Sequence, residues 1–403
     1  MNSSSNNAGK IAIIYLFCML IFHQVMAQSD QRVIGMKQLI NEEFQFAAQQ
    51  YKVLLQNTPL DKMPRTYING KVMTSGIDWW TSGFVPGSLW YIYEQTGDTA
   101  IKSAAEQRLI QEEKMKRYTG NHDIGFMIFC SFGNAFRITG EAKYKDIIDT
   151  AAVYQSTRYR PAIHAIQSWN TSNKFQCPVI IDNMMNLEQL CWVTAHGGDK
   201  KYMQIAIQHA NTTLVNHFRE DYSSYHVVDY DINNGSVLKK GTHQGLADSS
   251  AWARGQSWAL YGYTMMYRYT KDKKYLTQAN HIAAFILQHT DLAEDKIPYW
   301  DYNAPVNEHT LRDASAASVM ASALLELGQY VKGDLKKVYV QTAEKILRTL
   351  SSEVYRSKLG ENGGFILKHS VGSLPGNSEV DLPLTYADYY FLEALKRFKD
   401  WYL

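Results

Sequence analysis

The sequence predicts an all-α fold, a closed (α/α)6 toroid made of six helical hairpins. Three observations predict it: paired amphipathic helices recur along the chain, short polar turns separate the members of each pair, and an apolar helix near each chain end lacks a neighbour. Each turn has a Gly or Lys-Asp where a helix ends and an Asp, Glu or Thr near the next helix start. The turns lie at residues 96–98, 139–141, 196–199, 270–272 and 332–334.

The two unpaired helices decide between an open array and a closed ring. They are expected at residues 35–56 and 383–400, and both carry apolar residues that need a partner. An open solenoid would have polar helices at its ends, whereas pairing these two makes a sixth hairpin and closes the ring. The other five hairpins are expected at approximately residues 84–118, 122–157, 183–217, 252–290 and 313–353.

Strand signals are confined to loops. Residues 225–239 predict a β-hairpin that turns at Asn234-Gly235. A calcium loop starting at Asp229 is a poor match, because Lys240 occupies the position of the bidentate Glu. No CxxC pair, HExxH motif or zinc-like cluster of His and Cys occurs in the sequence, so we expect no metal and no cofactor.

The N-terminus has the pattern of a secretory signal peptide, which we place at residues 1–27. A basic residue precedes an apolar run over residues 11–22, and Val25 and Ala27 supply the small residues of a cleavage site. Residues 28–403 are then expected to form one catalytic domain that is exported, to the periplasm in a bacterium with two membranes. An uncleaved N-terminal anchor is the alternative. No later stretch approaches the ~20 apolar residues of a membrane span.

Composition excludes several classes of protein. The chain of 403 residues has 45% hydrophobic and 20% charged residues, with 41 basic against 39 acidic side chains. This argues against disorder and against a polybasic nucleic-acid binder. Cleavage of the signal peptide leaves Cys130, Cys177 and Cys191, an odd number that cannot all pair internally. We expect Cys130 and Cys191 to be core residues.

The toroid brings the unusual side chains together. If the first helix of each hairpin lies inside the ring, all inner helices point the same way, and the segments that precede them gather at one end. Trp, His, Asp, Gln and Arg accumulate in those segments, and aromatic residues with a few polar groups are typical of ligand pockets. The segments are residues 76–87, 120–126, 178–188, 242–258, 307–318 and 376–390.

Two carboxyl groups stand out at this end. Asp123 and Asp182 each precede an apolar helix, so each is either an N-cap or a functional acid. The apolar residues 178–181 would bury Asp182, and a second carboxylate one hairpin earlier would approach it. Burial and a like charge both raise the pKa of a carboxyl group, whereas a helix N-terminus lowers it. The sequence leaves open which effect prevails.

The other polar and aromatic candidates also have two interpretations. His122, His226 and His243 are either structural histidines or site residues. Arg254 lies in an apolar helix start, so its burial requires an anion, either a protein carboxylate such as Asp248 or a substrate carboxylate. The tryptophans at inner-helix starts are either core residues or platforms on which sugar rings stack: Trp79, Trp80, Trp169, Trp252 and Trp258.

Several motifs together resemble the unsaturated glucuronyl hydrolases of glycoside hydrolase family 88. They are HDIGF (122–126), IIDNMMNLE (180–188), HVVDYD with THQG and SSAWARGQSWALYGY (226–263), RDASAAS (312–318) and ADYYFLEAL (387–395). The resemblance implies an (α/α)6 barrel that removes a 4,5-unsaturated uronic acid from the non-reducing end of oligosaccharides produced by polysaccharide lyases. It also implies hydration of a vinyl ether without a metal or a nucleotide.

The resemblance further implies roles for particular residues. Asp182 would be the general acid and base, and an ionised Asp123 would be its partner and sustain its raised pKa. Arg254 or Gln244 would hold the substrate carboxylate. The residues expected to bind the sugar are Trp80, His122, Trp169, His226, His243, Gln244, Arg254 and Trp258.

Three alternatives remain at this point. An unsaturated rhamnogalacturonyl hydrolase would share the toroid and the chemistry but act on pectin-derived disaccharides. A polysaccharide lyase would create the double bond instead of consuming it, and a non-catalytic sugar-binding protein would not need two carboxylates. Lys368 and His369 in a late loop are either contacts to the adjacent sugar or part of a solvated turn. The partner is an unsaturated oligosaccharide in the first interpretation, with the oligomeric state open.

Overall fold

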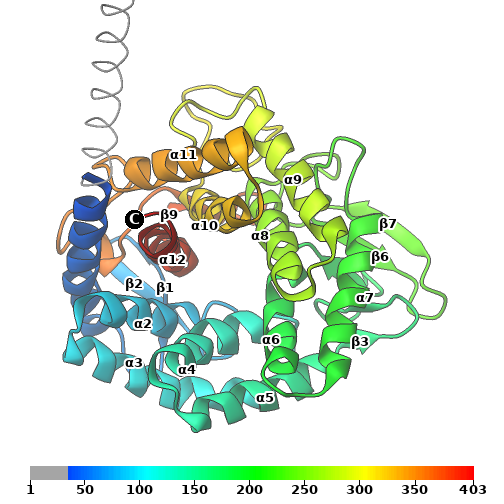
Figure 1. Cartoon of the computed structure of the whole chain (residues 1–403), viewed down its shortest axis with the longest axis horizontal. Coiled ribbons are helices and arrows are strands. Elements are labelled where there is room, and N and C mark those ends of the chain that lie inside the picture. Colours follow the sequence, from blue (N-terminus) through cyan, green and yellow to red (C-terminus); the bar gives the residue numbers. More distant parts are fainter. Residues whose placement is uncertain (1–34) are drawn as a thin grey trace, which may run out of the picture.

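The helices form a closed ring of hairpins, which confirms the predicted (α/α)6 toroid (Figure 1). The computed structural model describes residues 35–403, and the expected signal peptide lies outside the described residues. The sixth pair joins α12 (Thr385–Tyr402) to a helix over residues 35–56. The others are α2 (Phe84–Thr96) with α3 (Thr99–Glu112), η2 (Gly125–Gly133) and α4 (Asn134–Thr139) with α5 (Ala142–Ser156), α6 (Asn183–Ala195) with α7 (Lys200–Asn216), α8 (Ala253–Thr270) with α9 (Lys273–Gln288), and α10 (Ala314–Tyr330) with α11 (Gly333–Leu350).

Contacts between neighbouring inner helices continue around the whole ring. In order, α2, η2, α6, α8, α10 and α12 each contact the next, and α12 contacts α2 again. The inner helix α10 is buried from Ala314 to Gly328, whereas the outer helix α11 buries only one face. This difference follows from position, because an inner helix is covered on all sides and an outer helix faces water on one side.

The predicted turns occur where the sequence places them. Gly97 and Gly140 follow α2 and α4 with φ near +70°, a left-handed conformation that glycine adopts without steric cost. Asp98, Asp199 and Asp272 cap the next helices, each accepting a hydrogen bond from a backbone N–H in the first turn. Local capping therefore separates the two helices of these hairpins.

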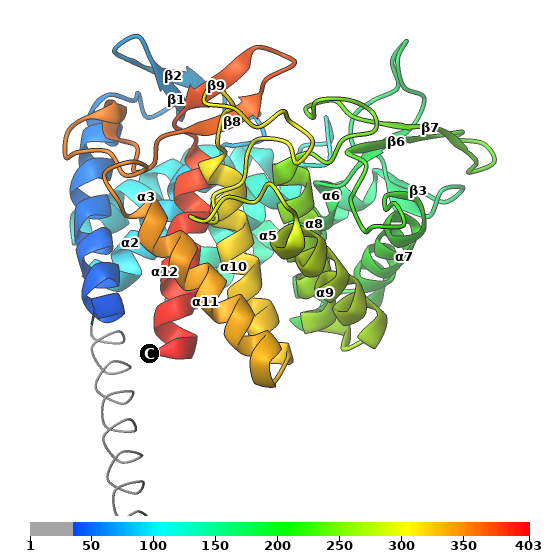
Figure 2. The same cartoon turned by 90° about the horizontal axis from the view of Figure 1, so that it is seen from above.

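The strands lie mostly at one end of the toroid, and the C-terminal end of α12 lies at the other (Figure 2). The predicted hairpin is present as β6 (Val227–Tyr230) and β7 (Val237–Gly241), with Gly235 at φ +77° in the turn. The other strands pair antiparallel in small sheets: β1 (Met63–Ile68) with β2 (Lys71–Ser75), β3 (Tyr159–Arg160) with β4 (Ala165–Ile166), β5 (Pro178–Ile180) with β6, and β8 (Ser370–Ser373) with β9 (Ser378–Leu382).

The expectation that two cysteines are buried in the core holds, and one helix differs from the expected form. Cys130 and Cys191 are buried and unpaired, as expected of core residues. The inner helix after Asp123 begins as a nine-residue π-helix, η2, with η1 (Glu113–Arg117) and η3 (Asn362–Gly364) as short 3-10 turns elsewhere. Among residues 35–403, no helix is long and apolar enough to cross a membrane.

A single carboxylate ties the inner helices together near the barrel axis. Glu393 of α12 accepts hydrogen bonds from Tyr91 of α2 and Tyr261 of α8, each at 3.1 Å, and from Ser322 of α10 at 2.5 Å. Arg397, one turn later, pairs with it at 3.4 Å. Glu393 is 6% exposed, so its charge depends on these partners.

Replacing Glu393 by Ala is expected to lower the free energy of unfolding by about 3–5 kcal/mol, because it leaves the buried Arg397 with less compensation and three hydroxyl groups without an acceptor. Urea unfolding of the variant measures this effect. Asp334→Ala is the control, since its ion pair with Lys337 is exposed and worth less than about 1 kcal/mol. Equal losses in the two variants would contradict the proposed role of Glu393.

Candidate active site

A pocket of about 530 Å³ opens at the end where the inner helices begin. Residues from four of the six predicted segments line it, which confirms that these segments converge. The other two segments do not line the pocket but contact residues that do: Asp313 pairs with Arg254, and Tyr386 packs on Trp80. The lining residues are Trp79, Trp80, Asn121, His122, Asp123, Trp169, Ser172, Lys174, Phe175, Ile180, Asp182, His243, Gln244 and Arg254.

The two carboxyl groups face the same pocket and interact. Asp182 follows strand β5, whose pairing with β6 buries it to 7% exposure. Its side chain caps no backbone N–H, although it occupies the N-cap position of α6. Asp123 directly precedes the helical Ile124, but the Phe126 N–H in the first turn donates to Asn186 Oδ1, and the Asp123 carboxyl group contacts Asn186 instead. The capping interpretation is therefore wrong for both carboxylates.

Burial raises the pKa of both groups. The pKa of Asp123 rises to about 8, first because of burial and then because of the Asp182 charge. Burial raises the pKa of Asp182 to about 7, although the Arg254 charge lowers it. The pair therefore holds about one proton near neutral pH. The Arg254 charge favours the ionised form of Asp182, and the assignment of the ionised role to Asp123 stays a prediction.

A histidine stands beside each carboxylate. His122 Nε2 lies 3.4 Å from Asp123 Oδ1, and His226 Nε2 lies 3.5 Å from Asp182 Oδ2. Burial holds the pKa of both histidines far below the usual value, so both are neutral. His226 Nδ1 accepts the backbone N–H groups of His243 and Gln244, each at 3.1 Å. Its proton is therefore on Nε2, which faces Asp182.

The predicted aromatic residues take two different positions. Trp80 and Trp169 are partly exposed walls of the pocket, with Trp80 packed on Tyr386 at 4.9 Å between ring centroids. Trp258 is fully buried and packs against Phe126 at 5.3 Å. Neither Trp258 nor His226 lines the pocket. Both contact Asp182 from the side that faces the protein interior. They were expected to touch the sugar, and that contact stays a prediction, since the structure shows them beside Asp182 and outside the pocket lining.

The remaining tryptophans lie at the edges of this site. Trp252 is buried between the His226 ring at 4.6 Å and the Arg254 guanidinium at 4.3 Å. Trp79 is 38% exposed at the rim, where the Arg65 guanidinium stacks on it at 4.5 Å. Trp252 is therefore a core residue, and Trp79 is available to solvent.

The anion that compensates Arg254 is Asp313. The guanidinium pairs with Asp313 Oδ2 at 3.0 Å and donates to the carbonyl oxygens of Val371 and of Gly372. The anion is thus a protein carboxylate, but not Asp248, the example considered, because Asp248 pairs with Lys239 at 3.0 Å. Since its terminal nitrogens bind protein oxygens, Arg254 has fewer donors for a substrate carboxylate than expected.

The structure adds residues that the sequence analysis missed. Ser172, Lys174 and Phe175 line the pocket from an exposed loop between β4 and β5, and no motif marks this loop. Lys368 and His369 do not line the pocket. Lys368 donates to the carbonyl of Glu353, and His369 pairs with Asp381 at 2.7 Å. Within residues 35–403, no group of three or more His, Cys, Asp or Glu is arranged to hold a metal ion.

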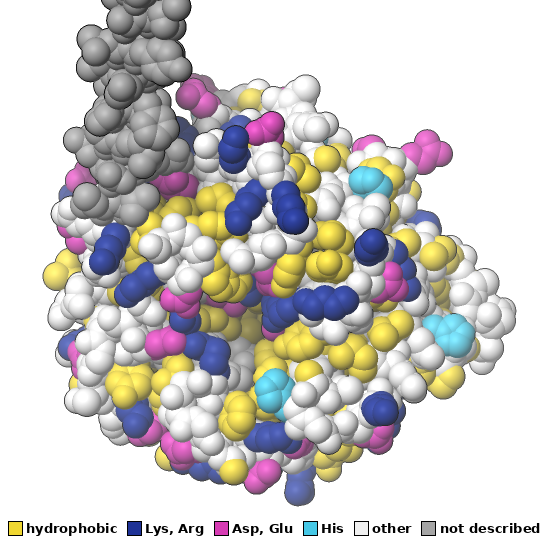
Figure 3. All heavy atoms as spheres, viewed as in Figure 1, with side chains coloured by type: hydrophobic (Ala, Val, Ile, Leu, Met, Phe, Trp, Pro, Cys, Tyr) yellow, Lys and Arg dark blue, Asp and Glu magenta, His cyan; other side chains and the backbone are white. Residues whose placement is uncertain are grey.

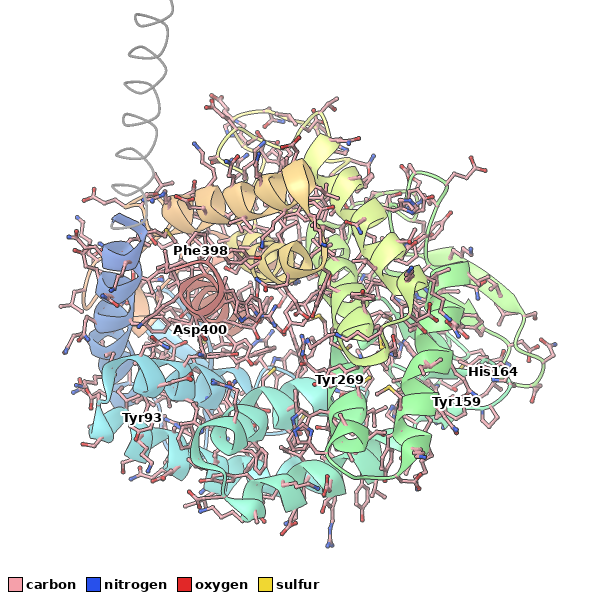
Figure 4. The ribbon with its side chains drawn as sticks, in the orientation of Figure 1. Tyr93, Tyr159, His164, Tyr269, Phe398 and Asp400 are labelled. Atoms are coloured by element: carbon pink, nitrogen blue, oxygen red, sulfur yellow. The ribbon has the colours of Figure 1, made fainter. Side chains whose placement is uncertain are left out.

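A second pocket, of about 420 Å³, opens at the opposite end of the barrel. It forms a hollow near the middle of the face in Figure 3, with charged side chains around it. Tyr269 of α8 and Asp400 of α12, which both line it, are labelled on this face in Figure 4. One of the cations that line it, Arg268, pairs with Glu188 and Glu326. The protein itself thus neutralises this charge.

Comparison with known proteins supports a glycosidase. The family model described as Glycosyl Hydrolase Family 88 matches residues 55–402. An unsaturated glucuronyl hydrolase from Formosa agariphila is 49% identical over 320 residues, 79% of each chain. An unsaturated chondroitin disaccharide hydrolase from Streptococcus agalactiae is 33% identical over 332 residues, 80% of this chain and 82% of the other.

Solved structures agree with the sequence relatives. A crystal structure of an unsaturated glucuronyl hydrolase specific for heparin has a TM-score of 0.87 and 46% identity, over 90% of this chain and 97% of the other. The unsaturated glucuronyl hydrolase structure from S. agalactiae has a TM-score of 0.85 and 30% identity, over 91% and 94%. The chain belongs to glycosyl hydrolase family 88 and is a glycosidase.

The raised pKa values have a consequence for stability. A carboxyl group whose pKa is higher in the folded state than in the unfolded state costs stability as the pH rises from about 4 through about 7. We therefore expect Asp182→Asn to have almost the same free energy of unfolding as wild type at pH 4. At pH 8 its free energy of unfolding is expected to be higher than that of wild type, by on the order of 3 kcal/mol. Chemical unfolding at both pH values measures the difference.

The matched control for this prediction is Asp199→Asn. Its carboxylate accepts a hydrogen bond from the Lys201 backbone N–H at a helix start, which holds the pKa of Asp199 below its usual value. Asp199→Asn is therefore expected to be less stable than wild type at pH 8, because the substitution removes a charge that stabilises the folded state. Loss of stability in Asp182→Asn at pH 8 would contradict the prediction.

Proposed function

We propose that this enzyme removes a 4,5-unsaturated uronic acid from the non-reducing end of glycosaminoglycan oligosaccharides produced by lyases. The observation that carries this proposal is the pair of buried carboxyl groups, both with raised pKa values, that faces one aromatic-lined pocket. The names of the relatives, which specify glucuronyl, chondroitin and heparin substrates, favour this substrate over the pectin-derived one.

A shared proton suits the hydration of a vinyl ether. The substrate has a C4=C5 double bond joined to the ring oxygen, so transfer of the Asp182 proton to C4 leaves an oxocarbenium-like cation at C5. The Asp182 carboxylate then takes a proton from a water molecule, and the oxygen of that water forms a bond to C5. The resulting hemiketal opens, and the glycosidic oxygen leaves as a hydroxyl group of the adjacent sugar. Water is the only co-reactant.

Substrate binding decides where the shared proton resides. Sugar hydroxyls that donate to Asp123 favour its ionised form, and this leaves the proton on Asp182. The Nε2–H of His226 faces Asp182 Oδ2 and stabilises the carboxylate once the proton has been transferred. Trp80 and Trp169 provide faces on which the sugar rings stack.

A panel of unsaturated chondroitin, hyaluronan and heparin disaccharides, with and without sulfate, tests the substrate class. We expect the absorbance of the double bond to fall with at least one of them, because the product no longer contains C4=C5. The unsaturated rhamnogalacturonyl disaccharide is the competing substrate. Turnover of the pectin-derived disaccharide alone would reject the proposed substrate, and rising absorbance on intact polymer would indicate a lyase.

Asp182→Asn is the control for the chemistry in the same assay. Asn cannot supply the proton, so kcat is expected to fall by at least about 10³-fold while the disaccharide still binds. Isothermal titration calorimetry measures the binding. Turnover within about tenfold of wild type would remove Asp182 from the assigned role.

We also propose that the enzyme is exported, with cleavage after Ala27. The support is the apolar run over residues 11–22 and the small residues Val25 and Ala27. Expression of the full chain in its native host is expected to give a mature protein that starts at Gln28 in the periplasmic fraction. N-terminal sequencing of that fraction measures this, and an intact Met1 on membrane-bound protein would show an uncleaved anchor instead.

A further inference from the structure

We propose that Asn186 is a positioning residue of the reaction: its side-chain amide fixes the tautomer of His122 and the position of Asp123. Asn186 lies on α6 one turn after Asp182, so the two side chains share a face of the helix. It is 1% exposed and does not line the pocket. Any effect on catalysis must therefore pass through other residues. The proposal rests on the proposed function.

The orientation of the Asn186 amide follows from one contact. The backbone N–H of Phe126, in the first turn of the π-helix η2, donates to Asn186 Oδ1 at 2.8 Å. A backbone N–H can only donate, so the atom facing it is the oxygen, and the amide nitrogen points the other way. This assignment removes the usual ambiguity between oxygen and nitrogen.

The amide nitrogen then fixes the proton of His122. Asn186 Nδ2 lies 3.4 Å from His122 Nδ1, and Nδ2 can only donate. Nδ1 must accept, so the proton of the neutral ring is on Nε2, which lies 3.4 Å from Asp123 Oδ1. The Asn186 side chain also makes a hydrogen-bonding contact with the Asp123 carboxyl group. The Asn186 amide thus contacts three groups: the Phe126 N–H at the start of η2, the His122 ring and the Asp123 carboxyl group.

The packing around Asn186 holds its side chain close to the start of η2. A Cβ atom on Gly125 would lie 2.8 Å from both Asn186 Cα and Oδ1, so only glycine allows this close approach. The Asn186 carbonyl accepts a hydrogen bond from Gln155 Nε2 at 2.7 Å. The Gln155 side chain in turn accepts from Gln189 at 3.0 Å. Asn186 is therefore held by α5 and contacts the start of η2.

The charged groups around Asp123 define what a change at Asn186 would do. Asp182 raises the pKa of Asp123, and Arg158 and the Asn186 contact lower it. Tyr118 and His122 are the other titratable groups that face it. Removal of the amide donor, or addition of a negative charge at position 186, would therefore increase the proton affinity of the carboxyl pair.

Asn186→Asp separates this role from a structural one. The new side chain keeps an oxygen that accepts the Phe126 N–H, and in its ionised form it cannot donate to His122 and attracts a proton to Nδ1. We expect kcat to fall at least about tenfold with KM within about threefold, and the pH profile of kcat to move about one unit higher. In ¹⁵N-histidine spectra, His122 should change from the Nε2–H form to one protonated at Nδ1, with its signal assigned from a His122→Gln spectrum.

The matched control is Asn134→Asp, the same exchange in another buried inner-helix amide. Asn134 donates to the carbonyl of Cys130 and to the Tyr389 hydroxyl, away from the carboxyl pair. We expect its pH profile and the His122 signal to stay as in wild type. An unchanged profile and tautomer in Asn186→Asp, or the same shift in Asn134→Asp, would overturn the proposal.

The tautomer measurement also keeps this proposal separate from the proposed function. If the wild-type enzyme acts on none of the disaccharides, the function is wrong, and the histidine spectra still test the positioning role. If the enzyme is active but His122 carries its proton on Nδ1 in wild type, the role of Asn186 is wrong and the function stands.

Discussion

The repulsion between two carboxyl groups that share one desolvated pocket is the constraint on which the site depends. In water both would be ionised at neutral pH, and their burial here raises the pKa of Asp123 to about 8 and of Asp182 to about 7. The fold must supply the energy that holds them together, because each would be more stable if it were apart from the other. A stable scaffold around the site is therefore a requirement of the chemistry, not a separate property.

The toroid supplies that scaffold in a way that sequence patterns could predict. The helix period, the Gly and Asp punctuation and the unpaired terminal helices are local signals, and they led to the correct ring and hairpins. The prediction that segments before inner helices converge followed from topology alone. Strands such as β8 and β9 were not predicted, because their pairing depends on contacts with distant parts of the chain rather than on local propensity.

The candidate site was only partly predictable for the same reason. Motifs pointed to Asp123, Asp182 and the pocket tryptophans, but not to the partner of Arg254. That partner, Asp313, is 59 residues away in sequence and comes from another hairpin. Trp258 and His226 are buried beside Asp182 and do not line the pocket, which the sequence did not indicate. Sequence patterns indicate which residues are unusual, whereas only packing shows which of them face the solvent.

The two histidine and carboxylate pairs differ in what holds them, and this difference bears on the mechanism. His226 receives two backbone N–H groups, so its tautomer is part of the loop conformation and no single side-chain substitution removes it. His122 depends on the side chain of Asn186, which also contacts the start of a π-helix. A π-helix has an irregular hydrogen-bond pattern and often occurs at functional sites. The histidine beside Asp182 is therefore fixed by backbone donors, whereas the histidine beside Asp123 is fixed by a side chain that a single substitution can change.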